Sequence, residues 1–211
     1  MKVRNKIISL FASATIITCA AATNVLAQAK NFAGPSLAIN GGYVSGNTKL
    51  TNGASSIDFG ENTTIGGADI AYTFPVDNNF FVALGATYDF GKTKGGKVSD
   101  PEDNLTLSLD EHYSFYIQPG YTINNNTAIF AKLSHNQAEG KIAVTTTGNY
   151  GGSATKDISG WGYGFGIKSL LNNNFFIQAE VSLVEYDSET VGTTKVEAEV
   201  VSGIISVGYK F

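Results

Sequence analysis

Two side chains with the chemistry for nucleophilic catalysis, His112 and Ser114, lie two positions apart in the sequence. Successive side chains of a β-strand point to opposite faces, so residues two apart share a face. An imidazole placed in this way can take the proton of a serine hydroxyl and prepare it for acyl transfer. Glu111 is adjacent but falls on the opposite face, and we identify no other carboxylate to orient the histidine. We therefore interpret the pair as a chance placement and assign no catalytic residue.

A glycine series, Gly162, Gly164 and Gly166, is a second pattern with binding chemistry to consider. A dinucleotide fingerprint needs the spacing GxGxxG between a strand and a helix. Here the glycines alternate with apolar residues inside one strand pattern, and no helical pattern follows. We expect them to form a smooth inner wall against which rings of neighbouring strands fit.

Acidic residues and histidines give no regular metal site. Asp100, Glu102 and Asp103 carry oxygens suited to a divalent cation, but their order does not match a calcium-binding loop. His112 and His135 are too isolated to form a metal centre. The sequence therefore predicts a solvated acidic loop, no metal and no cofactor.

Strands must position all of these groups, because the chain repeats an alternation of apolar residues with small or polar ones. Eight segments have this period of two, and none of their apolar positions carries a charge. These positions are Leu37, Ile39, Tyr43; Ala68, Ile70, Tyr72, Phe74; Phe80, Val82, Leu84, Ala86, Tyr88, Phe90; Tyr113, Phe115, Ile117, Tyr121, Ile123; Ile129, Ala131, Leu133; Trp161, Tyr163, Phe165, Ile167; Phe175, Ile177, Ala179, Val181, Leu183; and Val201, Gly203, Ile205, Val207, Tyr209, Phe211.

The connections between these segments alternate in length. Short, Asn-rich turns are expected at 75–79, 124–126 and 171–174, and long, polar, Gly-rich loops at about 45–63, 91–111, 136–158 and 187–197. Transmembrane β-barrels have this asymmetry, with short periplasmic turns and longer outer connections. With eight strands, both ends of the mature chain would lie on the periplasmic side.

The face opposite the apolar positions distinguishes a membrane barrel from a soluble one. In a soluble barrel it would meet water and carry many charges, but here it is mostly small and neutral, as at Ser36, Ala38, Gly42 and Ser206. Small side chains suit the narrow interior of an eight-stranded barrel. A lysine facing lipid at mid-bilayer costs roughly 2–4 kcal/mol, which favours a charge-free outer face. We therefore predict an all-β, eight-stranded antiparallel transmembrane barrel, with a soluble ligand-binding barrel as the alternative.

The N-terminus has the pattern of a cleavable signal peptide. Lys2, Arg4 and Lys6 precede an uncharged, largely apolar run, and small residues lead to a cleavage site after Ala27 or, alternatively, after Ala29. The run falls short of the roughly 20 apolar residues that a membrane helix needs. We expect this leader to be removed.

Cleavage would divide the chain into a signal peptide, 1–27, and one barrel domain, 28–211. The signal peptide contains Cys19, so the mature chain would hold no cysteine. The net charge would change from −4 to −7, because three basic residues are lost. This acidic surplus, without a basic stripe, argues against a nucleic-acid partner.

Four motifs stand out within the strand pattern: GWGYGFGIK at 160–168, FFIQAE at 175–180, QPGY at 118–121 and VGYKF at 207–211. Together they resemble the opacity-type and OmpA-like small barrels of the outer-membrane β-barrel domain proteins. The resemblance implies a place in the bacterial outer membrane, with lipid and lipopolysaccharide as surroundings. It also implies a C-terminal assembly signal at Tyr209 and Phe211 for periplasmic chaperones and the barrel-assembly machinery. A closed barrel has no free edge, so a monomer is expected.

The aromatic residues of the apolar face sort by expected depth into two girdles, since membrane interfaces favour amphipathic rings. Those expected near the periplasmic rim are Phe74, Phe80, Tyr121, Phe175, Tyr209 and Phe211, and those near the outer rim are Tyr43, Tyr88, Phe90, Tyr113 and Trp161.

Six charged residues fall on the inward face: Asp69, Asp89, Lys132, Lys168, Glu180 and Lys210. An unpaired charge is costly in a narrow lumen, so Lys132 or Lys168 should pair with Glu180 or Asp69. Gln118 and Gln178 would supply further hydrogen bonds. We interpret these residues as a structural plug, with a gate for ions as the alternative.

For function, we predict a non-enzymatic surface protein whose outer loops contact host, matrix or lipopolysaccharide, because loops on a rigid frame commonly carry binding. A narrow porin-like ion channel is the alternative. A second alternative is a lipid A-modifying acyl hydrolase, since His112 and Ser114 resemble the pair of lipid A deacylases. The residues after Ser114 depart from that family's pattern, and the pair would point inward, away from lipid.

Overall fold

The computed structural model describes residues 29–53, 55–99, 103–146, 151–171, 174–191 and 194–211; the expected signal peptide lies outside them. The described residues form one short 3-10 helix and ten strands. No helix among them is long and apolar enough to cross a membrane. The elements are η1 (Ala29–Phe32), β1 (Gly34–Asn52), β2 (Ser55–Pro75), β3 (Phe80–Phe90), β4 (Thr93–Ser99), β5 (Asp103–Thr122), β6 (Thr127–Thr146), β7 (Gly151–Leu170), β8 (Phe175–Tyr186), β9 (Glu189–Val191) and β10 (Thr194–Lys210).

Eight long strands close into a barrel. Their order is β1-β2-β3-β5-β6-β7-β8-β10, and β10 pairs with β1, so the sheet has no open edge over this span. β4 and β9 follow β3 and β8 after short interruptions, β4 pairing with β5 and β9 with β10. Every pairing is antiparallel, which confirms the fold predicted from the sequence.

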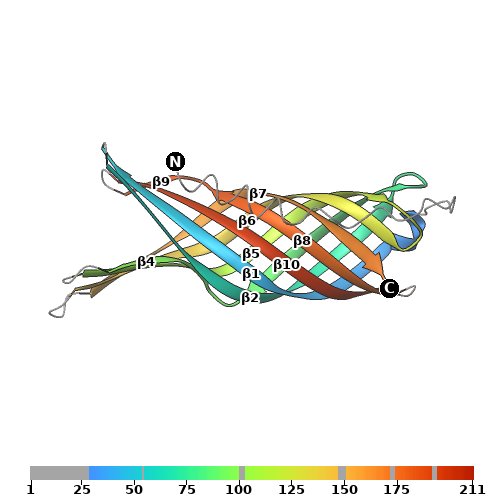
Figure 1. The fold of residues 1–211 in the computed structure, drawn as a ribbon, viewed down its shortest axis with the longest axis horizontal. Coiled ribbons are helices and arrows are strands. Elements are labelled where there is room, and N and C mark those ends of the chain that lie inside the picture. The colour runs from blue at the N-terminus through green and yellow to red at the C-terminus, as the bar shows by residue number, and fades with distance from the viewer. Residues whose placement is uncertain (1–28, 54, 100–102, 147–150, 172–173, 192–193) are drawn as a thin grey trace.

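The eight barrel strands are steeply tilted relative to the barrel axis. A ring of register partners that leaves β1 at Pro35 returns to it at Ser45, ten residues further along. Such a stagger requires strands inclined to the barrel axis. Figure 1 shows them winding obliquely, with the C-terminus at one end and β4 and β9 at the other. We call these the terminal end and the hairpin end.

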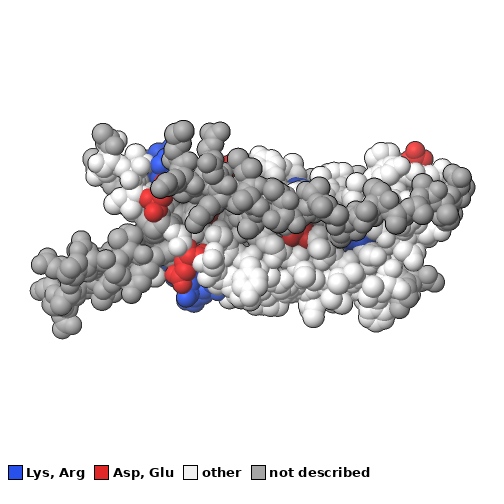
Figure 2. All heavy atoms as spheres, viewed as in Figure 1, with Lys and Arg blue, Asp and Glu red and all other residues white. Residues whose placement is uncertain are grey.

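The apolar face of each barrel strand points outward. On β1, Ile39 is 70% exposed and Ala38 is 4% exposed; on β10, Ile205 is 58% exposed and Ser206 is 7% exposed. The predicted direction of the two faces is therefore confirmed. The described part of the flank in Figure 2 is white over most of its length, and charged atoms gather at the hairpin end.

The expectation of long loops is wrong over most of the four segments. β1 continues to Asn52 and β2 begins at Ser55, and β6 and β7 extend equally far into the segment 136–158. Polarity misled this prediction, because a strand that leaves the membrane has both faces in water and loses its apolar alternation while it keeps its hydrogen-bonded ladder. These strands have 19 to 21 residues, and crossing a bilayer takes about 9–11.

Candidate functional site

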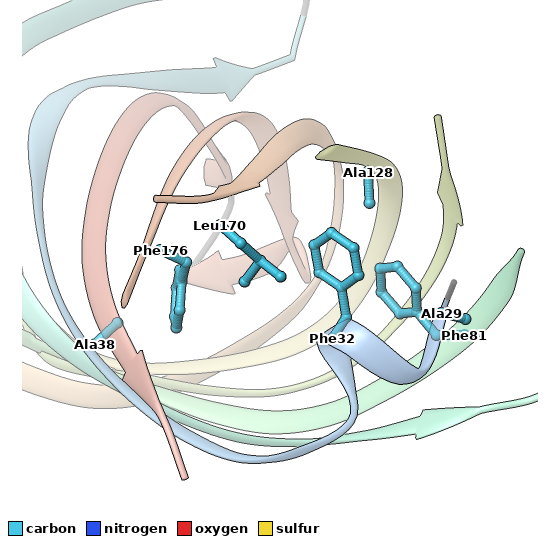
Figure 3. Close-up of a cluster of buried hydrophobic side chains, with 7 residues drawn as sticks. All are labelled: Ala29, Phe32, Ala38, Phe81, Ala128, Leu170 and Phe176. Carbon is cyan, nitrogen blue, oxygen red and sulfur yellow. The ribbon is translucent and has the colours of Figure 1, made fainter. Parts of the chain in front are cut away.

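An apolar layer closes the terminal end of the lumen. η1 lies inside the opening, and its Phe32 stacks on Phe81 of β3 with 5.6 Å between the ring centroids. Leu170 of β7 and Phe176 of β8 complete the layer, and all four side chains are buried. Figure 3 shows these side chains filling the space enclosed by the strands. Water and ions therefore meet a packed hydrocarbon barrier at this end.

An ion pair occupies the middle of the lumen. Lys132 Nζ lies 3.2 Å from Glu180 Oε1 and donates a hydrogen bond of 3.3 Å to Oε2. Gln178 Nε2 also donates to Glu180 Oε2, at 3.4 Å. The same ammonium group lies 4.3 Å from the ring centroid of Tyr116, a cation–π contact. Both charges are thus compensated within the barrel.

Asp69 and Lys168 do not form a pair with each other. The Asp69 carboxylate accepts hydrogen bonds of 3.0 Å from Thr87 Oγ1 and from the Tyr116 hydroxyl. Lys168 is buried closer to the terminal layer, with Nζ 3.9 Å from the ring centroid of Phe176. Of the two lysines expected to pair with Glu180 or Asp69, the structure thus places Lys132 beside Glu180 and Lys168 over an aromatic ring.

A carboxylate does lie beside His112, which corrects the sequence interpretation. Asp89 Oδ2 of β3 lies 2.5 Å from His112 Nδ1 of β5. The β3–β5 register explains this contact: Thr87 pairs with Ser114 and Tyr88 with Tyr113, so one step further Asp89 comes opposite His112 on the inward face. A β-bulge follows on β5, where the β5–β6 register shifts between Asp110 and Tyr113 and Glu111 adopts a positive φ of 49°. Because the bulge exchanges the faces of β5, Asp110 points outward although His112 points inward.

A second apolar layer covers the polar residues toward the hairpin end. Ala138, Val184 and Tyr186 form its buried centre, and Leu109 and Val200 are among the side chains packed around it. A cavity of about 80 Å³ remains between this layer and the ion pair. That volume holds a few water molecules and no larger ligand. The polar middle of the lumen is thus enclosed between two apolar layers.

The predicted girdle residues lie on the outer face in two belts. Rings from neighbouring strands touch within them, as in Phe80 with Tyr121 at 4.9 Å and Phe175 with Tyr209 at 5.0 Å between centroids. The terminal belt contains Phe74, Phe80, Tyr121, Phe175, Tyr209 and Phe211, and the outer belt Tyr43, Tyr88, Phe90, Tyr113 and Trp161; all are exposed. Belts of this kind mark the two interfaces of a membrane.

A charged cluster lies just beyond the outer belt. Lys92 Nζ and Lys141 Nζ each lie 3.0 Å from Oδ2 of the buried Asp110, and Lys141 also contacts Glu139 at 2.6 Å. Burial alone would raise the pKa of the Asp110 carboxyl, but the hydrogen bonds and charges of the two lysines outweigh it and hold this pKa below its ordinary value.

This depressed pKa predicts an acid-sensitive contribution to stability. A carboxyl whose pKa is lower in the folded state stabilises the fold above its unfolded pKa, and the contribution is lost as the pH falls through the folded value. We expect Asp110→Asn to remove part of the stability loss of the barrel below about pH 4. Urea titrations of the refolded protein at pH 7 and at pH 3 measure this. Asp77→Asn, in an exposed turn, serves as the control, and an equal change in both variants would contradict the assignment.

The structure brings Lys132 and Glu180 together, as expected for the inward charges, and it exposes the expected girdle rings. The sequence analysis missed the apolar layers. Phe81 and Phe176 each follow an outward-facing aromatic residue by one position. Their inward direction could therefore have been predicted from the alternation of side chains along a strand. The contact of Asp89 with His112 joins two residues that alternation already turns inward, and it was missed because it depends on the register of β3 against β5. The bulge at Glu111 has no glycine or proline signal in the sequence.

A closed antiparallel barrel with an apolar exterior, two aromatic belts and a filled polar lumen defines an integral β-barrel membrane protein. The model of the outer membrane protein beta-barrel domain family matches residues 12–211, and the chain belongs to this family. The protein is therefore a bacterial outer-membrane protein. By the asymmetry of such barrels, the short turns of the terminal end face the periplasm.

The chain is similar to several solved outer-membrane proteins. OprG from Pseudomonas aeruginosa has a TM-score of 0.50 and 14% identity, covering 89% of this chain and 99% of that chain. Ail, the attachment invasion locus protein of Yersinia pestis, has a TM-score of 0.43 and 18% identity, covering 85% and 99%. The protease OmpT from Escherichia coli has a TM-score of 0.42 and 11% identity, covering 84% and 97%. No curated protein sequence matches the chain. At 14% identity, the likeness to OprG shows the fold alone.

Proposed function

We propose that this protein works at the cell surface, where the hairpin end contacts a host surface, extracellular matrix or lipopolysaccharide while the barrel serves as a rigid anchor. The observation that carries this proposal is the length by which the barrel strands extend beyond the outer belt. β1 runs nine residues past Tyr43 to Asn52, which corresponds to about 30 Å along the strand. Paired strands of this length present a stiff surface at little entropic cost on binding.

The filled lumen favours this proposal over a porin-like channel. Ions would have to pass the layer around Phe32 and Phe81, the Lys132–Glu180 pair and then the layer around Tyr186. Opening such a path requires both packed layers to move as well as the ion pair to break. We therefore interpret the inward charges as part of the anchor.

Burial of Ser114 favours the same proposal over an acyl hydrolase. Its side chain is 4% exposed and lines the 80 Å³ cavity together with Asp89 and His112. An acyl chain from the membrane would have to cross the barrel wall to reach the hydroxyl group. We propose that these three residues, like Lys132 and Glu180, fill the lumen.

The outer face supports the expected membrane partners. We propose that the two aromatic belts contact outer-membrane lipid and lipopolysaccharide, and that Tyr209 and Phe211 are recognised by periplasmic chaperones and the barrel-assembly machinery. β1 and β10 pair along their full common length and leave no free edge in the membrane, which supports a monomer.

Shortening two hairpins tests the proposed function. Register pairs allow 97–106 and 142–154 each to be replaced by an Asn-Gly turn without shifting the remaining strands. We expect the doubly shortened protein to lose at least tenfold in cell-surface attachment, because the projecting contact area is removed. Binding of expressing cells to immobilised matrix proteins and to epithelial cells measures the effect.

Insertion of the shortened barrel must be shown in the same cells, by its altered migration in unheated gels. Substitution of Asp77 and Asn78 in a turn of the terminal end provides a control that should leave attachment unchanged. Normal attachment by an inserted, doubly shortened barrel would contradict the proposal.

A further inference from the structure

An open hollow of about 880 Å³ lies on the outer face of the barrel, directly beyond the outer belt. Its wall is formed by β7, β8, β10 and the β1–β2 hairpin, and Trp161 and Tyr163 form its edge toward the membrane. Figure 1 shows β1, β2, β9 and β10 diverging from β5, β6 and β7 at this end. Because Trp161 of the outer belt borders the hollow, we place it at the level of the lipid headgroups.

Carboxylates dominate the wall of this hollow. Glu185 and Glu199 are register partners on β8 and β10, so their side chains lie directly opposite each other on one face. Their other register partners are Trp161 and Asn47, neither of which is basic. Like charges in such positions destabilise a sheet. Burial and the charge of Glu185 raise the pKa of Glu199, as expected for two uncompensated carboxylates.

The next positions along the strands add further acidic groups. Asp187, Glu197 and Asp58 also line the hollow. Lys49 is the single basic residue among the described residues that line the hollow, and it is the register partner of both Glu197 and Asp58. Lys195, outside the lining, lies 2.8 Å from Glu197. Negative charge therefore remains in excess, and it is concentrated around Glu185 and Glu199.

Aromatic rings stand next to these carboxylates. Trp161 is 50% exposed and Tyr163 is 55% exposed, and Trp161 is the direct register partner of Glu185. An ammonium or guanidinium group is attracted by the face of an indole or phenol ring as well as by a carboxylate. The two kinds of group together favour organic cations over anions and neutral sugars.

We propose that this hollow binds a lysine- or arginine-rich polypeptide segment, with the charged groups near Glu185 and Glu199 and the aliphatic stems against Trp161 and Tyr163. The size of the hollow supports a polypeptide occupant, because a bare metal ion needs oxygens within about 2.0–2.6 Å and fills a small part of such a volume. The excess negative charge complements the charged head of a lysine or arginine side chain, and the exposed rings complement its apolar stem. The proposal rests on the surface role proposed above and names the partner class for one part of that surface.

Trp161 provides a direct measurement, because it is the single tryptophan of the chain. Hexalysine, which does not fluoresce, is titrated into the full-length mature protein refolded in phosphatidylcholine nanodiscs. We expect a saturable change in Trp161 emission that weakens with added salt. Glu185→Gln combined with Glu199→Gln should raise the dissociation constant at least tenfold, and Tyr163→Leu at least threefold. Glu139→Gln, an acidic residue outside the hollow, is the matched control and should leave it unchanged.

If the double variant fails to refold, Asp187→Asn with Glu197→Gln replaces it, with the same expected direction. The proposal is overturned if hexalysine produces no saturable change, or if the control variant weakens binding as much as the double variant. It is also overturned if equimolar magnesium displaces the peptide and Tyr163→Leu has no effect, since the hollow would then be a metal site. The doubly shortened barrel retains the whole hollow, so it should bind hexalysine even though it no longer supports attachment. Loss of attachment and loss of peptide binding are therefore separate results.

Discussion

Replacing Lys132 by methionine is expected to destabilise the barrel by about 3–5 kcal/mol, the cost of leaving one partner of a buried ion pair uncompensated. The side chains of Lys132 and Glu180 are 13% and 8% exposed, so solvent screens the remaining charge weakly. Methionine keeps most of the aliphatic stem and removes the charge. Gln178 would remain as a hydrogen-bond donor to Glu180, but it is neutral. Equilibrium unfolding in urea, followed by Trp161 fluorescence in lipid vesicles, measures the free energy of unfolding.

The double variant Lys132→Met with Glu180→Met separates charge from packing. If the loss in the single variant comes from the unpaired carboxylate, removing that carboxylate should restore most of the stability, since apolar replacements of a buried pair are often neutral or stabilising. Equal destabilisation of the single and double variants would show instead that the loss comes from altered side-chain packing, and it would contradict this account of the pair.

The result also bears on the channel alternative. A gate that opens by breaking the Lys132–Glu180 pair would conduct more readily once the pair is removed. In the structure, the apolar layers around Phe81 and Tyr186 lie on either side of the pair, and neither layer includes Lys132 or Glu180. We therefore expect the double variant to conduct no more current than the wild type in planar bilayers.

The fold was largely predictable because membrane barrels obey strict alternation. A residue such as Ile205 must face lipid and Ser206 must face the lumen, and a shift by one residue would exchange all of them. Polarity, in contrast, reports the solvent and not the secondary structure. Beyond Tyr43 the strand β1 enters water, so the sequence of its last nine residues resembles that of a loop.

The lumen was less predictable because its contacts depend on the register between strands that are distant in the sequence. Alternation turns both Asp89 and His112 inward, but the register of β3 against β5, which comes from the structure, sets them opposite each other. The hollow beside Trp161 depends on how the strands bend away from each other. Alternation places Glu185 and Glu199 on a face, but the register that sets them opposite each other comes from the structure.

Close approach of rings to glycines explains the interior and leads to a second large effect. Gly208 of β10 is inward, and a Cβ added there would collide with the ring of Phe176 and lie 2.8 Å from the Cβ of Ala38. Comparable collisions await a Cβ at Gly120, with Phe81, and at Gly166, with Phe130. The expectation that the glycines of the 162–166 series accommodate neighbouring rings is confirmed at Gly166. It is wrong at Gly162 and Gly164, where the nearest atoms belong to Ser134 and Ser182 and to other residues without rings.

Gly208→Val is therefore expected to destabilise the barrel by about 1–3 kcal/mol or more, because three extra carbons must be fitted into the filled terminal layer. Gly203→Val is the matched control on the same strand, since a Cβ there meets nothing within 4 Å. Valine favours a strand, so the control should be neutral or slightly stabilising, and only Gly208→Val should lower the stability. Adding Phe176→Leu to Gly208→Val should recover part of the loss, because the smaller side chain vacates the space that valine needs. Urea unfolding of the four proteins measures these differences, and equal stability of the Gly208 and Gly203 variants would contradict the packing of the terminal layer described here.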